Sequence, residues 1–142
     1  GIGLMGDVAR GVHDKGGHVV GVIPEFFLNN EQPIEYLKAD ELIVAKDMRS
    51  RKAIMDERSD AFIVLPGGIG TLEEATEVIS MKQLGLTEKP IVFINTNKFY
   101  DAFILNLNDC PFALKDLACT LKVIFLSVRS SVYTTLLNTT LL

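Results

Sequence analysis

Short apolar runs alternate with amphipathic stretches along the first two thirds of the chain. Four runs are rich in β-branched residues, which is typical of buried strands; they occupy residues 18–23, ended by Pro24, and residues 41–45, 61–65 and 90–95. Apolar positions at helical spacing predict a helix over residues 4–13, and start and stop signals predict helices over residues 48–59 and 71–84. This alternation predicts an α/β fold, a Rossmann-like doubly wound parallel sheet with helices on both faces.

Local signals define the ends of these helices. Gly16 and Gly17 are expected to end the first helix, because glycine accepts the left-handed conformation that closes a helix. Asp47 is expected to cap the second helix and Thr71 the third, and Gly85 to end the third. The helices therefore have recognisable starts or stops.

The pattern weakens after about residue 104. Residues 109–142 are rich in Leu, Thr and Ser, with few charges and no clear caps. A last strand is predicted within residues 121–128, a run far shorter than the ~18 apolar residues of a membrane span. We expect a single, partial nucleotide-binding domain over residues 1–142, with residues 105–142 as a poorly matching tail.

The composition of the chain limits the classes of function that it can have. The 142 residues are 48% hydrophobic and 23% charged, as in an ordinary α/β domain, and the net charge of −4 argues against nonspecific nucleic-acid binding. Cys110 and Cys119 are expected to be reduced and buried, and His13 and His18 lack a third ligand, so no disulfide framework or metal site is expected. The first residues lack the layout of a signal peptide and resemble a truncation, and we expect a cytoplasmic protein without membrane association.

The most informative segment follows the run at residues 61–65. Residues 66–74 read P-G-G-I-G-T-L-E-E. A strand that leads through glycines into a helix leaves backbone N–H groups available to an anion, and the helix N-terminus adds roughly half a positive charge. This predicts a phosphate site, and Glu74, one turn into the helix, suggests chemistry beside it.

Glu74 also has a purely structural interpretation. Thr71 and Glu74 match the capping box T-x-x-E, in which the acid bonds back to the N–H of the cap. Glu73 and Glu77 are competing acids, although both fit a solvated helix face better. From the residues alone, Glu74 is a cap or a catalytic acid.

A second cluster is basic and begins the helix at residues 48–59. It consists of Met48, Arg49, Ser50, Arg51 and Lys52. Cations are disfavoured by up to ~1 kcal/mol at a helix start, which suggests an anionic partner. In a parallel sheet this helix start and the glycine loop emerge at the same edge, so the two clusters are predicted to converge. The alternative is a solvated basic patch whose charge is balanced by the acidic residues Asp47, Asp56 and Glu57.

A third glycine segment opens the chain. Residues 1–6 fit G-x-G-x-x-G, but no strand precedes them, so a dinucleotide site is weakly indicated. The turn at Gly3 is a candidate for lining a second part of a nucleotide pocket.

Together these segments resemble the LONELY GUY family. Residues 66–74 match its motif P-G-G-x-G-T-x-x-E and residues 48–52 its motif M-[HR]-x-R-K; further family segments at residues 3–6, 21–24, 83–85 and 89–90 follow in order. The similarity covers approximately residues 1–103. Members are cytokinin-activating phosphoribohydrolases, and many carry the label lysine decarboxylase. Decarboxylation would need a pyridoxal-binding lysine in its own setting, which nothing here supports.

The resemblance implies hydrolysis of the N-glycosidic bond of N6-substituted adenosine 5′-monophosphate, without metal or cofactor, by a homodimer. It implies that Glu74 and Arg51 are catalytic, with Arg49 a weaker candidate. It also implies a set of residues that bind substrate and phosphate: Gly67, Gly68, Gly70, Thr71, Lys52, Met48 and Gly3.

The chain departs from the family pattern in several places. It lacks the family's first strands, so the sheet is expected to be incomplete. Met81 stands where Trp is common and Thr87 where His is common, which can change packing or base specificity. Two rival functions remain open: a non-catalytic carrier of a nucleotide or molybdenum cofactor, and an inactive fragment.

Overall fold

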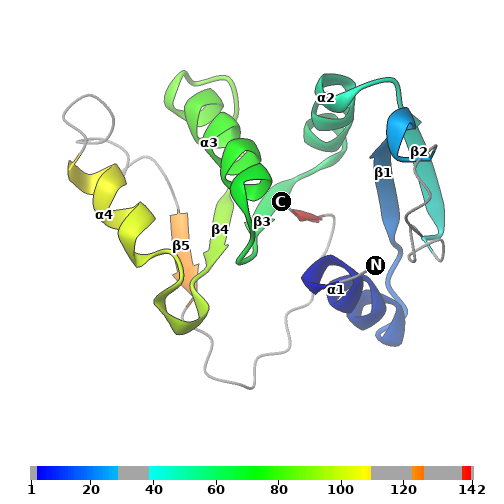
Figure 1. Cartoon of the computed structure of the whole chain (residues 1–142), viewed down its shortest axis with the longest axis horizontal. Helices are drawn as coiled ribbons and strands as arrows, with labels where there is room; N and C mark the ends of the chain where they lie inside the picture. The colour runs from blue at the N-terminus through cyan, green and yellow to red at the C-terminus, as the bar shows by residue number, and fades with distance from the viewer. Residues whose placement is uncertain (1–2, 29–38, 110–122, 127–138, 142) are drawn as a thin grey trace. The chain divides into compact units, whose positions relative to one another are not determined.

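The computed structural model describes residues 3–28, 39–109, 123–126 and 139–141 (Figure 1). These residues form two compact units, Gly1–Arg58 and Ser59–Leu142, which are described separately. Both units combine strands with helices, and every pair of described strands is parallel. The predicted α/β, Rossmann-like class is confirmed.

The first unit contains a two-stranded sheet and two helices. Its elements are α1 (Leu4–Asp14), β1 (Val20–Pro24), the 3-10 turn η1 (Glu25–Phe27), β2 (Glu41–Ala45) and α2 (Met48–Arg58). β1 and β2 pair in parallel, with Val22 opposite Ile43. α2 packs against both strands, and Arg58 at its end forms a bidentate ion pair with Glu41 of β2, with N···O distances of 2.6 and 2.9 Å.

Glycine ends α1 as predicted. Gly16 has φ +72°, a left-handed conformation that other residues adopt at a cost. Its N–H donates to the carbonyl of His13, and the N–H of Gly17 donates to the carbonyl of Val12, each at 2.9 Å. This pair of bonds is the Schellman motif, which satisfies carbonyls left open at a helix end.

The strands of the first unit are less buried than predicted. In β1 only Pro24 is buried, and in β2 only Ala45. Leu42 and Val44 are exposed and alternate with half-buried residues. The prediction of fully buried strands is therefore wrong here: in β2, side chains alternate between half-buried and exposed positions before Ala45, as a strand with one covered face does.

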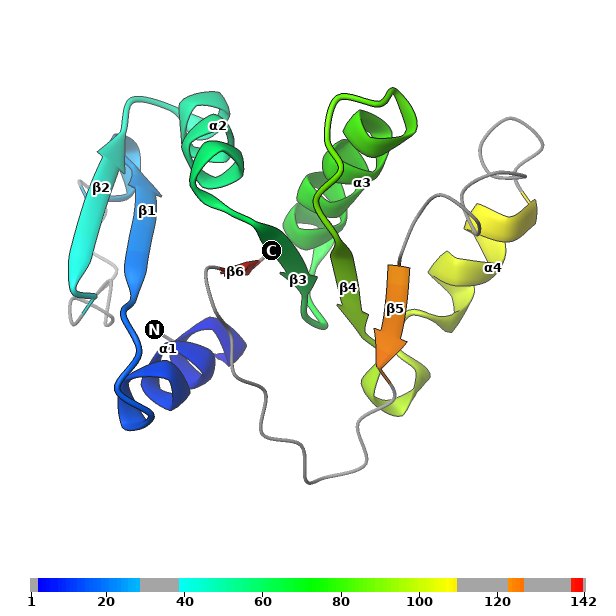
Figure 2. The same ribbon diagram turned by 180° about the vertical axis from the view of Figure 1, so that it is seen from behind.

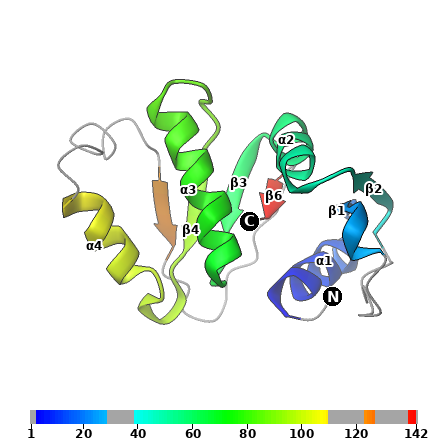
Figure 3. The ribbon, with the colours of Figure 1, turned by 45° about the horizontal axis from the view of Figure 1, so that its top comes forward.

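The second unit contains a four-stranded parallel sheet in the order β5-β4-β3-β6. Its elements are β3 (Ala61–Val64), α3 (Ile69–Gln83), β4 (Ile91–Ile94), the 3-10 turn η2 (Thr96–Lys98), α4 (Asp101–Asp109), β5 (Val123–Leu126) and β6 (Thr139–Leu141). β5 confirms the strand predicted within residues 121–128. α3 and α4 lie against the same face of this sheet, as Figure 2 shows from behind and Figure 3 from above.

The core of the second unit lies between this sheet face and the two helices. Alternate strand residues face it: Phe62, Val64, Ile91 and Phe93 are all at most 1% exposed. From the helical side, α3 contributes Ala75, Val78 and Ile79, and Tyr100 completes the cluster. Among the described helices, none combines the length and apolarity of a membrane span.

Candidate active site

The glycine loop leads directly into α3, but the helix starts earlier than predicted. Gly68 is the N-cap, with extended φ −85° and ψ −162°, and its carbonyl accepts the first helical bond from the N–H of Leu72 at 3.2 Å. The prediction that Thr71 is the cap is wrong, because an extended glycine serves as the cap and lets the helix begin at Ile69. Glu74 is then the sixth helical residue, too far along to be the acid of a capping box.

The fold requires glycine at one position of the loop and not at two others. A Cβ added to Gly67 would lie 2.3 Å from Oγ1 and 2.9 Å from Cβ of Thr71, so glycine is required there by the fold. At Gly68 and Gly70 an added Cβ would meet no atom within 4 Å, and neither residue has a positive φ. Neither packing nor backbone conformation within the described structure requires glycine at these two positions.

The first turn of α3 presents N–H groups that no helical carbonyl accepts. The first four N–H groups of a helix lack an intrahelical acceptor, here those of Gly68, Ile69, Gly70 and Thr71. Gly68, Ile69 and Gly70 are exposed. Because the helix dipole adds positive potential at the same end, this turn is suited to an anion such as phosphate.

Glu74 lies on the buried side of α3. It is 9% exposed and follows Thr71 by one turn on the same helix face, a face that continues with buried Val78. Glu73 and Glu77 are exposed, which confirms their interpretation as acids on a solvated face. Of these three carboxylates, only Glu74 is held in the interior beside the loop.

The basic cluster begins α2, which Asp47 caps as predicted. Oδ1 of Asp47 accepts hydrogen bonds from the backbone N–H of Ser50 at 2.7 Å and from its hydroxyl at 2.8 Å. These bonds to Ser50, with a smaller contribution from the charge of Lys46, hold the pKa of Asp47 below its usual value. A carboxylate therefore offsets the helix dipole beside the cations.

Arg51 differs from the other cations of this cluster. It is half-buried, and its Nε donates to the carbonyl of Val22 in β1 at 3.2 Å. Lys52 is also half-buried, whereas Met48 and Arg49 are exposed. The guanidinium of Arg51 is thus held against β1.

Gly3 forms the N-cap of α1, as a glycine turn should. It has φ +87° and ψ −164°, a conformation that glycine alone adopts readily. The N–H groups of Gly6 and Asp7 donate to its carbonyl. Its predicted role beside a ligand stays a prediction.

The predicted residues fall into two groups, one in each unit. Gly3, Met48, Arg51 and Lys52 belong to the first unit, and the residues from Gly67 to Glu74 to the second. Their convergence into one site stays a prediction. Cys110 and Cys119 lie outside the described residues, and among those described no three His, Cys, Asp or Glu side chains gather as a metal site would require.

One contact beside the loop involves a residue that no motif marks. The hydroxyl of Tyr100 donates to the carbonyl of Leu65, the residue before Pro66. The signal available in the sequence was its place soon after the strand at residues 90–95, because in a parallel sheet that strand ends beside the strand that delivers the loop.

Comparisons with known proteins show which family the chain resembles. Residues 5–111 match the family described as "Possible lysine decarboxylase". The chain is 50% identical over 104 residues to a probable cytokinin riboside 5'-monophosphate phosphoribohydrolase of Arabidopsis thaliana, LOG6, covering 73% of this chain and 51% of that protein. It is also 50% identical over 99 residues to a cytokinin riboside 5'-monophosphate phosphoribohydrolase of Rhodococcoides fascians, covering 70% of this chain and 50% of that one. The chain thus spans about half the length of the curated relatives it matches.

Proposed function

The chain belongs to the family described as possible lysine decarboxylase, together with the LONELY GUY phosphoribohydrolases, and we propose that it hydrolyses a nucleoside 5′-monophosphate. The bond broken is the N-glycosidic bond of adenosine 5′-monophosphate or its N6-substituted forms. The products are the free base and ribose 5-phosphate. A homodimer and a cytoplasmic location, both implied by the resemblance, belong to the same proposal.

The observation that carries the proposal is the burial of Glu74 beside an anion-binding helix start. Glu74 is 9% exposed, one turn from Thr71 of the glycine loop. A phosphate held at Gly68, Gly70 and Thr71 would bring the attached ribose near this carboxylate. The openness around Gly68 and Gly70 supports this, because a close approach by a ligand explains glycines that the fold itself does not need.

Glu74 would act on the sugar. Departure of the base leaves an oxocarbenium-like centre at C1′, which a carboxylate stabilises. The same carboxylate accepts a proton from the attacking water, whose oxygen forms the new bond to C1′ as the bond to the base nitrogen breaks. The base leaves with a proton from solvent or from the site.

Arg51 would act on the base as it departs. A guanidinium stays charged at any working pH, so it can stabilise negative charge as the base leaves or hold the substrate in place. The hydrogen bond from its Nε to the carbonyl of Val22 sets the orientation of the guanidinium. Lys52, Met48 and Gly3 are proposed to line the substrate, with Lys52 able to contact phosphate.

The test is release of free base by the purified protein, measured for three substrates. Adenosine 5′-monophosphate and its N6-isopentenyl form should both release base, and adenosine, which lacks the phosphate, should be a far poorer substrate. Arg51→Ala should lower the rate by about 100-fold or more. Tight binding of the nucleotide without release of base would identify a carrier instead, and equal rates with adenosine would refute phosphate recognition by the loop.

A further inference from the structure

The phosphate-binding loop has an anchor at its strand end. The paired register of β3 with β4 ends at Val64 opposite Phe93, so Leu65 lies just beyond the paired strand. Its carbonyl accepts a hydrogen bond from the hydroxyl of Tyr100. Burial raises the pKa of Tyr100 above its usual value near 10, so the phenol remains a donor at neutral pH.

Tyr100 is itself fixed from several sides. Its backbone N–H donates to Oδ1 of Asn95 at 2.7 Å, and Nδ2 of Asn95 donates to Oδ1 of Asp101 at 2.8 Å. Its ring, 1% exposed, makes edge contacts with Phe93 at a centroid distance of 5.2 Å and with Phe99 at 4.9 Å. The hydroxyl is therefore held at a set position relative to the end of β4.

The other end of the loop is fixed by packing. Thr71 lies so close to Gly67 that a Cβ there would overlap it. The segment that contains Gly68 and Gly70 is thus held at two places. Tyr100 bonds to the residue that precedes Pro66, and Gly67 packs against Thr71. Backbone donors bind an anion well only when their directions are set in advance, because ordering them on binding lowers affinity.

We propose that Tyr100 is a positioning residue for the phosphate-binding loop, acting through the carbonyl of Leu65. Its hydroxyl sets where the chain leaves β3, and thereby the directions of the N–H groups that follow Pro66. In identifying the ligand as the phosphate of a nucleoside 5′-monophosphate, this inference rests on the proposed function. Tyr100 does not touch the reacting atoms, so its effect falls on phosphate affinity rather than on the chemical step.

The test compares Tyr100→Phe with the wild-type protein. Phenylalanine keeps the ring contacts and removes only the hydroxyl. We expect the Kd for ribose 5-phosphate, measured by calorimetry, and the KM for adenosine 5′-monophosphate to rise by about three- to tenfold, the effect of one hydrogen bond. The kcat should change less than about twofold.

Phe103→Leu is the matched control, because it disturbs the same aromatic cluster without touching Leu65. Phe103 packs against the core, with its ring centroid 5.7 Å from that of Phe93 and 6.2 Å from that of Tyr100. It should lower stability and leave the Kd for ribose 5-phosphate unchanged. An unchanged Kd in Tyr100→Phe, or an equal rise in Phe103→Leu, overturns the inference.

The same experiment separates this inference from the proposed function. If the wild-type protein binds ribose 5-phosphate but releases no base, the proposed hydrolysis fails, and the Kd values still decide the role of Tyr100. If the wild-type protein releases base but does not bind ribose 5-phosphate, the role of Tyr100 in phosphate binding is overturned and the proposed hydrolysis stands.

Discussion

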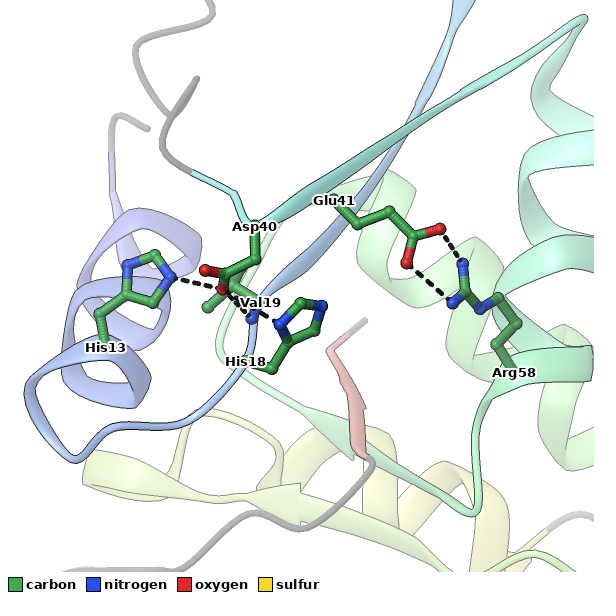
Figure 4. Close-up of polar contacts among 6 residues, drawn as sticks. All are labelled: His13, His18, Val19, Asp40, Glu41 and Arg58. Carbon is green, nitrogen blue, oxygen red and sulfur yellow. Dashed lines mark hydrogen bonds and ion pairs between the residues drawn. The ribbon is translucent and has the colours of Figure 1, made fainter.

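Oδ2 of Asp40 lies 2.9 Å from Nε2 of His13, so a residue just before β2 is joined to the last turn of α1 (Figure 4). The same oxygen accepts the backbone N–H of Val19 at 2.7 Å and lies 3.6 Å from Nδ1 of His18. One carboxylate thus connects α1 with the starts of both strands of the first unit.

Because of this carboxylate, we predict that the protein loses stability in acid. The N–H of Val19, and then the hydrogen bond with His13, hold the pKa of Asp40 below its ordinary value of 3.8. A carboxyl group with a lowered pKa in the folded state stabilises the fold above its unfolded pKa, and this contribution is lost as the pH falls through the folded value. Asp40→Asn should therefore lower the melting temperature at neutral pH and have less effect near pH 3.

Thermal unfolding between about pH 3 and pH 7 checks this prediction. Asp60→Asn, at an exposed position, is the control for a change of charge alone. A difference between Asp40→Asn and the wild type that is the same at every pH would show that ionisation of Asp40 does not contribute.

Alanine substitutions at the loop glycines should change stability and nucleotide binding in different ways. Gly67→Ala places a Cβ against Thr71 and should destabilise the protein by about 1–3 kcal/mol, as overpacking does. Gly70→Ala adds a methyl group to open space inside a helix and should raise stability by up to about 1 kcal/mol. The same methyl group should weaken binding of adenosine 5′-monophosphate, because the ligand can no longer approach the backbone.

Thermal unfolding and calorimetric titration of the same samples measure both effects. Gly70→Ala is the informative variant, since its two effects have opposite signs. If it binds the nucleotide as tightly as the wild type, the loop does not approach a phosphate at this position.

The turn after β4 stores backbone strain. Asn97 and Lys98 have φ of +53° and +61°, in the left-handed region. Asparagine tolerates this region, whereas lysine does so at a cost. Lys98→Gly should raise the free energy of unfolding by about 0.5–1 kcal/mol, and Lys98→Ala, which keeps the strain, should not. Chemical denaturation of the two variants decides between strain and simple loss of the charge.

Much of the secondary structure could be predicted, because strong local signals mark it. The cap at Asp47 and the stops at Gly16 and Gly85 depend on hydrogen bonds within a few residues, and all three are present. The N-cap of α3, Gly68, lies three residues before Thr71, at which the sequence predicts a cap. Gly68 has no side chain that marks it as a cap, whereas Thr71 is a good capping residue.

The motif at residues 66–74 singles out Glu74 in the sequence. Glu74 is buried and Glu73 is exposed, and the catalytic role of Glu74 stays a prediction. Tyr100 could not be found in this way. Its contact with Leu65 joins residues 35 apart in the sequence, and only the pairing of β3 with β4 brings them together.

The most direct test of the central claim is the rate of base release from adenosine 5′-monophosphate by Glu74→Gln, beside Glu73→Gln as the exposed neighbour. Glutamine keeps the size of the side chain but cannot stabilise the sugar cation or accept the proton of water. We predict that Glu74→Gln lowers kcat by about 100-fold or more, with nucleotide binding retained, and that Glu73→Gln changes kcat little. A kcat in Glu74→Gln equal to that of the wild type would contradict the account.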